Sequence, residues 1–416
     1  MAALRPATPP PITRKSVSMA VAAMRMRARA APGRHRLQQV HMVQKGLMAL
    51  VSVETLGSRY DVRIEAGLIG RAGSLIRETL GDRRLFVIAD ETVWRHYESR
   101  LAEGLRGCDW AALPCPLDEP RKRMSTVERL SADMHTAGAD RSSAVVAFGG
   151  GVAGDVAGFV AASYMRGIDF VQVPTTLLAQ VDASVGGKTG VNLASGKNLV
   201  GAFHQPRLVL VDPDTLASLP DREYFAGVQE VVKHGIIRSS ELFDYMEACE
   251  SAVRERTGEA VEKMISESVR IKAEVVRADE RESGLRRILN FGHTLGHALE
   301  AETGYCTLLH GEAVGFGMIA AARLSELRGR LGSRDRERIE SVVLSYGSFA
   351  GLEGLDARNI AARIAGDKKA VGGRARFVLA DSIGSVSEEL DPPAEQVIAA
   401  TAHALAACGT VESAAV

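Results

Sequence analysis

Four short apolar runs limit what this chain can fold into. They are RRLFVIAD (83–90), SAVVAFGG (143–150), FVQVPTT (170–176) and RLVLVDP (207–213). Runs this apolar leave no face for water, so each predicts a strand that is covered on both sides. Helical segments such as ETVWRHYESRLAEGL and VAGDVAGFVAASY follow two of them. Strands alternating with helices in this way predict a parallel sheet with helices on both faces.

The chain before and after these runs reads differently. ALVSVETL and YDVRIEAG, from residue 49 on, predict a hairpin or a pair of strands. After Pro220 the strand signal nearly vanishes, with RARFVLA (374–380) as a possible late strand. Periodicity predicts helices over 223–250, 253–278, 286–303, 312–330 and 333–346.

Length and pattern together predict two domains. The chain has 416 residues, and single cores stop growing at about 250–300 residues. We therefore expect an α/β domain over residues 48–218 and a mostly helical domain over 219–416.

The first 47 residues are set apart by their charge. No Asp or Glu precedes Glu54, and this head is rich in Ala, Arg and Pro. It resembles an organelle transit peptide, or it is an over-long gene start with initiation at Met42 or Met48. The low Ser/Thr content favours the second interpretation, and either way we leave it out of the fold. A cytoplasmic location is expected, or a plastid one if the leader is genuine.

Bulk composition excludes several classes of protein. The 51 basic and 51 acidic residues cancel, so bulk charge favours neither nucleic acid nor a membrane surface. Five scattered cysteines without a CxxC indicate a reducing compartment and argue against a thiolate metal site. No uninterrupted apolar run approaches the roughly 20 residues of a membrane span.

Two histidines four residues apart occur in RILNFGHTLGHALE. On one helix, Arg286, Asn290, His293 and His297 fall within about 60° of arc and form a polar stripe. Gly292 and Gly296 inside such a helix each cost about 1 kcal/mol. We therefore expect a pocket here, with a ligand or another backbone close to the glycines.

A metal site needs further ligands. GVQEVVKHGII supplies Glu230 with Lys233 on the same helical face, and LLHGEAV supplies His310. Two imidazoles and one carboxylate suit a catalytic divalent ion such as zinc or cobalt. The spacing leaves open which two of His293, His297 and His310 bind the ion.

Two further segments predict an anionic ligand. In VVAFGGGVAGDVAGF, Gly149, Gly151 and Gly154 form a G-x-G-x-x-G turn between a strand and a helix, which suits a pyrophosphate, although a packing turn is an equal alternative. The run 166–206 places Thr175 and Thr176 at a strand end and then, in glycine-rich loops, Asp182, Lys188, Lys197 and Asn198. Basic groups among glycines indicate a phosphate or carboxylate ligand.

From about residue 50 to residue 390 the chain resembles the 3-dehydroquinate synthases, of the sugar-phosphate cyclase group. Ordered motifs carry the resemblance: GGGVAGDVAGFVAASYMRGIDFVQVPTTLLAQVDASVGGKTGVN, GKNLVGAFHQP, EVVKHGII, DERESGLRRILNFGHTLGHALE, LHGEAV and GDKKAVGG. The resemblance implies a Rossmann-like NAD-binding domain followed by a helical metal- and substrate-binding domain. It also implies a homodimer, to which Arg166 is contributed across the interface.

The resemblance assigns roles residue by residue. It implies that the metal ligands are Glu230, His293 and His310, while His297 faces the substrate. The implied catalytic and substrate residues are Asp182, Lys188, Asn198, Lys233, Lys272, Arg286, Asn290, His297, Lys368 (rather than Lys369) and Arg166. The implied NAD-binding residues are Asp90, Leu117, Asp118, Glu119, Pro120, Arg121, Lys122, Gly150, Gly151, Val152, Ala153, Gly154, Asp155, Thr175, Thr176, Leu178, Lys188, Lys197, Thr215, Leu216, Ala217 and Ser218.

The implied reaction explains the mixture of a metal, NAD and lysines. The substrate is 3-deoxy-D-arabino-heptulosonate 7-phosphate, converted to 3-dehydroquinate and phosphate in the shikimate pathway. NAD-dependent oxidation at C5, phosphate β-elimination, re-reduction and an aldol closure follow one another, so NAD is recycled. A basic pocket offsets the desolvation of the substrate's carboxylate and phosphate. Asp118 and Arg123 replace the family's usual Gly and Ser, which alters the loop near the ribose.

Two other interpretations stay open. One is a sister cyclase making an aminodehydroquinate, an inosose or a valiolone. The Lys272–Asn290–His297 set favours the dehydroquinate reaction, because relatives that act on other sugar phosphates resemble it less there, whereas the aminated version shares much of this pocket. A metal-dependent polyol or alcohol dehydrogenase of the same broad fold is expected to lack the Lys/Arg set and to release NADH. An inactive homologue is disfavoured because no expected ligand is missing.

Overall fold

In the computed structural model, residues 49–365 and 375–412 are described. The leader over 1–47 and Lys368 therefore lie outside the described residues. None of the described helices is both long and apolar enough to cross a membrane.

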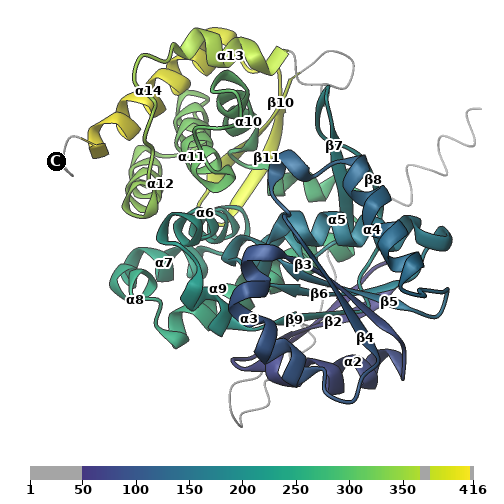
Figure 1. Ribbon diagram of the computed structural model, residues 1–416. Coiled ribbons are helices and arrows are strands. Elements are labelled where there is room, and N and C mark those ends of the chain that lie inside the picture. The colour runs from purple at the N-terminus through teal and green to yellow at the C-terminus, as the bar shows by residue number, and fades with distance from the viewer. Residues whose placement is uncertain (1–48, 366–374, 413–416) are drawn as a thin grey trace, which may run out of the picture. The chain divides into compact units, whose positions relative to one another are not determined.

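A seven-stranded sheet organises the first half of the chain (Figure 1). Its spatial order is β1-β2-β9-β6-β5-β3-β4, and only β1 and β2 pair antiparallel. The strands are β1 (Ala49–Glu54), β2 (Arg59–Ile64), β3 (Leu85–Asp90), β4 (Trp110–Cys115), β5 (Ala144–Gly149), β6 (Asp169–Pro174) and β9 (Leu208–Val211). The predicted hairpin and the four predicted apolar strands are confirmed, and β5 and β9 are buried along their whole length.

Helices cover both faces of this sheet. Leu85, Val87 and Ala89 of β3 pack on one face with η1 (Leu68–Arg71), α2 (Ala72–Leu80) and α3 (Glu91–Gly104). Phe86 and Ile88 point to the other face, which α4 (Met124–Thr136) and α5 (Gly151–Ser163) cover. Burial of alternate side chains on opposite faces explains why the sequence of these strands is continuously apolar.

The strand order reverses at β3. After β4 has paired on one side of β3, the chain returns to β5 on the other side. The carboxyl ends of β3 and β5 therefore flank the point where ligands bind in open parallel sheets.

Helices make up most of the second half. They are α6 (Asp221–Arg238), α7 (Ser240–Ala248), α8 (Glu250–Arg254), α9 (Gly258–Ala278), α10 (His293–Glu302), α11 (His310–Leu327), α12 (Ser333–Tyr346), α13 (Ala357–Ala365) and α14 (Ala394–Glu412). The late strand is confirmed as β10 (Arg376–Ser382), which pairs with β11 (Ser385–Leu390). One hydrophobic cluster joins β1, β2 and β9 to these helices. The division at residues 218 and 219 stays a prediction.

Three predicted helices are wrong in their extent. The helix expected over 253–278 is interrupted, because α8 ends at Arg254 and α9 begins only at Gly258. The helix expected over 286–303 is interrupted: η6 (Leu285–Asn290) is a 3-10 turn, Gly292 is left-handed at φ 79°, and α10 begins at His293. Arg286 and Asn290 therefore do not share a helix face with His293 and His297. The helix expected over 223–250 ends at Arg238, and the hydroxyl of Ser239 caps α7 by accepting from the backbone N–H of Leu242.

The sequence pattern missed several short elements. The hairpin of β7 (Lys188–Leu193) and β8 (Gly196–Phe203) occupies a segment read as glycine-rich loops. The missed segments also include β4, η2 (Glu119–Arg121), η3 (Tyr164–Arg166), the π-helical turn η4 (Ala179–Ala183) and η5 (Pro213–Ser218). Pro114 in β4 is tolerated because β4 is an edge strand.

Candidate active site

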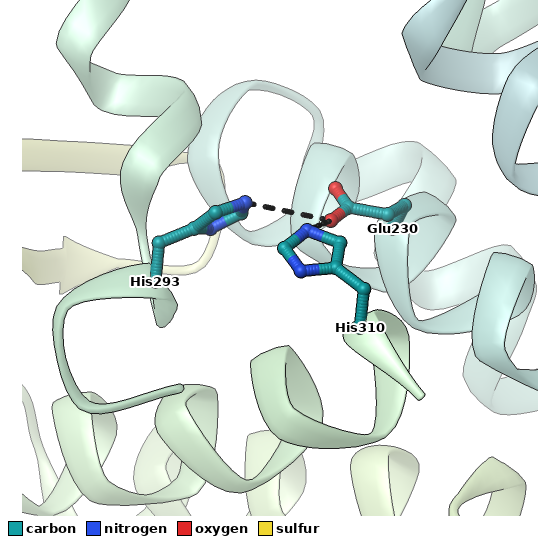
Figure 2. Close-up of side chains that lie close together, drawn as sticks. All are labelled: Glu230, His293 and His310. Atoms are coloured by element: carbon teal, nitrogen blue, oxygen red, sulfur yellow. Dashed lines mark ion pairs between the residues drawn. The ribbon is translucent and has the colours of Figure 1, made fainter. Parts of the chain in front are cut away.

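Three side chains from three helices converge on one point (Figure 2). Glu230 comes from the middle of α6, while His293 and His310 are the first residues of α10 and α11. Nε2 of His293 lies 3.6 Å from Oε1 of Glu230, and Nε2 of His310 lies 3.7 Å from the same oxygen. Two imidazole nitrogens thus face one carboxylate oxygen, too far away for hydrogen bonds.

This geometry fits a small divalent ion. Ligands bound at 2.0–2.2 Å in a tetrahedron lie about 3.3–3.6 Å apart. Glu230 is completely buried; its Oε2 contacts the Lys233 ammonium, whereas its Oε1 accepts no hydrogen bond from any residue that the structure describes. Nδ1 of His293 lies 3.1 Å from the main-chain oxygen of Phe291, which leaves Nε2 of that ring for an ion. A buried carboxylate oxygen without a hydrogen bond is costly, and a cation bound at Oε1 removes that cost.

Close packing of α10 on α11 fixes the spacing of the two histidines. A Cβ on Gly292 would lie 2.8 Å from the main-chain oxygen of Val314, and one on Gly296 would lie 2.7 Å from that of Ala313. On α11, a Cβ on Gly317 would overlap the main-chain oxygen of Gly292 at 1.8 Å. The expected close approach of another backbone to Gly292 and Gly296 is confirmed.

Charged neighbours shift the pKa of both histidines. Burial, followed by the Lys233 ammonium, lowers the pKa of His293 well below its usual value. Burial also acts to lower the pKa of His310, but the carboxylates of Glu300 and Glu230 outweigh it and raise that pKa. His293 is therefore held neutral, which is the form that binds a metal.

A second cluster of buried charges adjoins the first. Lys233, one turn after Glu230 on α6, contacts Oε2 of Glu230. Nζ of Lys272 from α9 lies 2.8 Å from Oδ1 of Asp182 in η4 and also donates to the main-chain oxygen of Asp182. Nε2 of His234 lies 3.6 Å from the same Oδ1. Two lysines and one aspartate therefore lie together beside the three converging side chains.

These contacts determine how the cluster ionises. Although burial opposes it, the ammonium groups of Lys272 and Lys233 hold the pKa of Asp182 well below its usual range. Burial lowers the pKa of Lys272 to about 8, against the raising effect of Asp182. Lys272 is thus a buried cation that loses its proton unusually easily.

The remaining substrate residues surround this cluster. Arg286 is buried and donates to the main-chain oxygens of Gly186, at 3.1 Å, and Glu280. Glu282 pairs with Lys188 and accepts a hydrogen bond from Nδ2 of Asn290 at 2.8 Å. The ring of His297 lies edge-on to His293, with 5.4 Å between centroids, and 5.9 Å from His310. The structure therefore brings His297, Asn290 and Lys188 to the site by different elements, not by one helix.

Several expected cofactor residues lie at the carboxyl ends of β3, β5 and β6, beside the point where the strand order reverses. β5 ends at Gly149, the helix α5 begins at Gly151, and neither a capping side chain nor an acidic residue occupies its first turn. Its free backbone N–H groups can therefore bind an anion. Thr175 follows β6, and its buried hydroxyl has no hydrogen-bond partner in the part of the chain that the structure describes. A Cβ on Gly151 would lie 3.5 Å from Ala183, next to Asp182, so the turn adjoins the lysine cluster.

A network of polar side chains lies beside the Gly149–Gly151 turn. Lys122 is only 4% exposed, and its Nζ contacts Asp155 and lies 2.6 Å from Oδ1 of Asn198. Asp90 caps α3 and accepts from the backbone N–H of Leu117 at 3.2 Å. Oε1 of Glu119 accepts from Asn192 of the β7–β8 hairpin at 2.8 Å. Asn198, expected in the substrate pocket, thus lies in the Lys122 network.

Several other predicted residues already have structural partners. Thr215 bonds Gln180, and Ser218 lies 2.8 Å from the Tyr97 hydroxyl, while Leu216 belongs to the hydrophobic core. Asp118 caps η2, which includes Glu119, Pro120 and Arg121. Lys197 lies 3.2 Å from Oε1 of Glu300. The turn that begins α5 contains or adjoins Gly150, Val152, Ala153 and Gly154, and the segment that leads into η4 contains Thr176 and Leu178. Ala217 lies in η5. Arg166 is exposed, with a left-handed φ of 73°.

Three residues of the site were not predicted. His234 follows Lys233, Glu300 lies three residues after His297, and Glu282 lies four before Arg286. Helical spacing was a usable signal for Glu300, because residues three apart share a face. Glu282 lies in an irregular segment with φ 58°, which no periodicity predicts.

Comparison with known proteins identifies one family along most of the chain. The family model for the 3-dehydroquinate synthase N-terminal domain matches residues 112–226, and the C-terminal model matches 227–370. The 3-dehydroquinate synthase of Solibacter usitatus is 51% identical over 335 residues, which cover 80% of this chain and 93% of that one. That of Koribacter versatilis is 48% identical over 356 residues, 85% of this chain and 97% of that one.

A solved structure shares the architecture. The 2-epi-5-epi-valiolone synthase of Streptomyces hygroscopicus subsp. jinggangensis, with NAD⁺ and Zn²⁺ bound, superposes with a TM-score of 0.77 at 30% identity and covers 85% of this chain and 98% of its own. A parallel-sheet domain followed by a helical domain is thus an arrangement that cyclases share.

Proposed function

The chain belongs to the 3-dehydroquinate synthase family, and we propose that its site converts 3-deoxy-D-arabino-heptulosonate 7-phosphate to 3-dehydroquinate and phosphate. One observation carries the proposal: Oε1 of Glu230, which is faced by His293 and His310, lies next to a buried set of lysines. A metal centre beside concentrated positive charge suits a substrate that is both a polyol and a polyanion.

Two groups complete this site, a divalent metal and NAD. The metal supplies Lewis-acid polarisation of a substrate oxygen, and NAD supplies a hydride acceptor that later gives the hydride back. Glu230, His293 and His310 hold the metal. The first turn of α5, with Thr175, Thr176 and the Lys122–Asp155 pair, holds NAD.

The basic residues bind the substrate's anionic groups. Lys233, Lys272 and Arg286 are each less than a tenth exposed, so their charges act at low dielectric and offset the desolvation of a carboxylate or phosphate. Asn290 and Lys188 exchange their shared partner Glu282 for substrate oxygens. His297 lies beside the metal ligands and is placed to hold or move a proton at a substrate hydroxyl.

A homodimer supplies the last substrate contact. Leu193, Leu199 and Phe203 of the β7–β8 hairpin, with neighbouring Met124, are 40–47% exposed, and an exposed apolar group of this kind favours association. α5, which leads into Arg166, packs on β7. Arg166 then reaches the partner's substrate. Sedimentation equilibrium tests this: a dimer that Phe203→Asp dissociates supports it, and a monomeric wild type contradicts it.

Two further expectations remain proposals. The chain divides near residues 218 and 219 into a nucleotide-binding and a metal-binding domain. The enzyme works in the cytoplasm, in keeping with its five free cysteines.

An assay of phosphate release tests the function. Purified protein with NAD⁺ and Co²⁺ or Zn²⁺ is expected to release inorganic phosphate from the heptulosonate phosphate without accumulating NADH. Steady growth of NADH absorbance would indicate a dehydrogenase. Phosphate release only from glucose 6-phosphate, or turnover only of sedoheptulose 7-phosphate, would indicate a sister cyclase.

A further inference from the structure

We infer that Glu300 is a positioning residue: it orients the metal ligand His310, and its ion pair with Lys197 ties the metal centre to the β7–β8 hairpin. The inference rests on the proposed metal role of Glu230, His293 and His310. It concerns a carboxylate for which neither the sequence pattern nor the family resemblance predicted a role.

Glu300 lies where a carboxylate is costly unless it is used. It is 4% exposed on α10, one turn after His297. Its Oε1 lies 3.2 Å from Nζ of Lys197 and 3.9 Å from Nδ1 of His310. A buried carboxylate needs such partners, and here the partners come from a hairpin and from another helix.

The two metal-binding histidines differ in what holds their rings. Nδ1 of His293 is held by the main-chain oxygen of Phe291, at 3.1 Å. The His310 ring has no main-chain acceptor among the hydrogen bonds of the described residues, and its Nδ1 faces Glu300. A ring that donates from Nδ1 keeps the lone pair of Nε2 for the ion, and such outer partners fix both tautomer and orientation.

The geometry separates Glu300 from the ligands. Glu300, His297 and His310 also lie close enough together to hold an ion. However, Glu230 faces Nε2 of His310, whereas Glu300 faces Nδ1, on the other side of the ring. Both histidines point Nε2 at the same oxygen of Glu230, Oε1. Glu230 is therefore the ligand, and Glu300 acts through His310.

The Lys197 contact extends this link to the cofactor side. Lys197 lies on β8, and its ammonium sits 4.5 Å from the centre of the Tyr305 ring in the turn that follows α10. The next residue, Asn198, bonds Lys122. A shift of Glu300 is therefore transmitted both to His310 and to the hairpin that borders the nucleotide turn.

Metal binding to apoprotein, without substrate or NAD, tests the inference. The variants are Glu300→Ala, Glu300→Gln and Lys197→Met, with Glu302→Gln as the matched control, since Glu302 lies on the same helix and pairs with Arg363 at 2.7 Å. Co²⁺ affinity is measured by competition with a chelating dye, the visible Co²⁺ spectrum reports ligand geometry, and circular dichroism checks folding.

Glu300→Ala is expected to weaken Co²⁺ binding roughly 10–100-fold and to alter the Co²⁺ spectrum. Glu300→Gln is expected to keep more affinity, because its amide oxygen still faces Nδ1 of His310. Lys197→Met should weaken Co²⁺ binding by less than Glu300→Ala does, because Glu300 keeps His310 but loses its ion pair, and Glu302→Gln should bind Co²⁺ as the wild type does. Folded Glu300→Ala and Glu300→Gln proteins with wild-type affinity would overturn the inference. So would a Glu300→Gln protein as defective as Glu230→Gln, because Glu300 would then be a ligand. A wrong reaction assignment would instead appear only in the phosphate assay, with metal binding intact.

Discussion

The two sides of this site are built from different groups. The cofactor side, defined by the Gly149–Asp155 turn with Thr175 and Thr176, offers backbone N–H groups, a helix end and hydroxyls. The metal side, defined by Glu230, His293, His310, Lys233, Lys272, Asp182 and Arg286, offers charged side chains that are mostly buried. We therefore expect the cofactor side to be most sensitive to a methyl group added at its glycine turn, and the metal side to be most sensitive to a changed charge.

Removing a ligand should have the largest effect, and only on the metal side. His310→Ala is expected to reduce metal affinity by more than the roughly 100-fold that bounds the loss of an outer partner. His297→Ala should keep the metal and lose turnover by about 10²–10⁴-fold. Metal content after dialysis and phosphate release distinguish the two variants. Equal metal loss in both would show that His297 is a ligand.

The second-largest effect is expected from a methyl group added on the cofactor side, and it should affect NAD binding but not metal binding. Gly151→Ala is expected to raise the NAD Kd at least tenfold, about 1.4 kcal/mol, while Co²⁺ binding stays unchanged. The new Cβ meets Ala183 at an ordinary 3.5 Å, so the fold accepts it and only the cofactor's approach is affected.

Gly258→Ala is the control for that variant. Gly258 is also the first residue of a helix, and a Cβ there has nothing within 4 Å. Isothermal titration with NAD⁺ measures both proteins. A Gly151→Ala protein with normal NAD affinity would place the pyrophosphate elsewhere.

A pH effect should follow from Lys272 on the metal side. Because burial lowers its pKa from 10.5 to about 8, kcat/KM is expected to fall above pH 8, by up to about tenfold per pH unit. Lys272→Arg should remove this alkaline limb, since arginine keeps its charge.

The stability of the folded protein should change with pH in the opposite direction to kcat/KM. Between pH 8 and 10.5 the unfolded chain holds the Lys272 proton and the folded chain does not, so this group's contribution to stability rises with pH. Thermal unfolding across the same pH range therefore distinguishes loss of charge from loss of fold. A kcat/KM that stays flat to pH 10 would contradict the assignment.

The smallest effect is expected from a charge on the cofactor side. Asp118 is exposed and caps the short η2 turn by accepting from the backbone N–H of Arg121 at 3.0 Å. Asp118→Gly removes a cap of about 1 kcal/mol or less, so the NAD Kd should change by less than about fivefold. A loss as large as that of Gly151→Ala would mean that this loop, and not the glycine turn, dominates NAD binding.

Features with a regular sequence pattern could be predicted, whereas features set by contacts between distant elements could not. The buried strands were found because their two covered faces make them continuously apolar, and the family motifs named three side chains that do converge. Residue spacing alone left open which histidines face Glu230. The break before His293 was missed because the left-handed turn at Gly292 is set by its contact with α11. The β7–β8 hairpin was missed because its glycines and polar residues hide a strand pattern.

The glycine contact between α10 and α11 also bears on which ions the protein accepts. His293 and His310 begin two helices that touch backbone to backbone, so the gap between their imidazoles is set by main-chain atoms and not by adjustable side chains. An ion with longer bonds, such as Ca²⁺ at 2.3–2.6 Å, would have to push whole helices apart. We therefore expect the packing of α10 on α11 to determine which ionic radii the site accepts. Only variants that loosen this packing should bind larger ions.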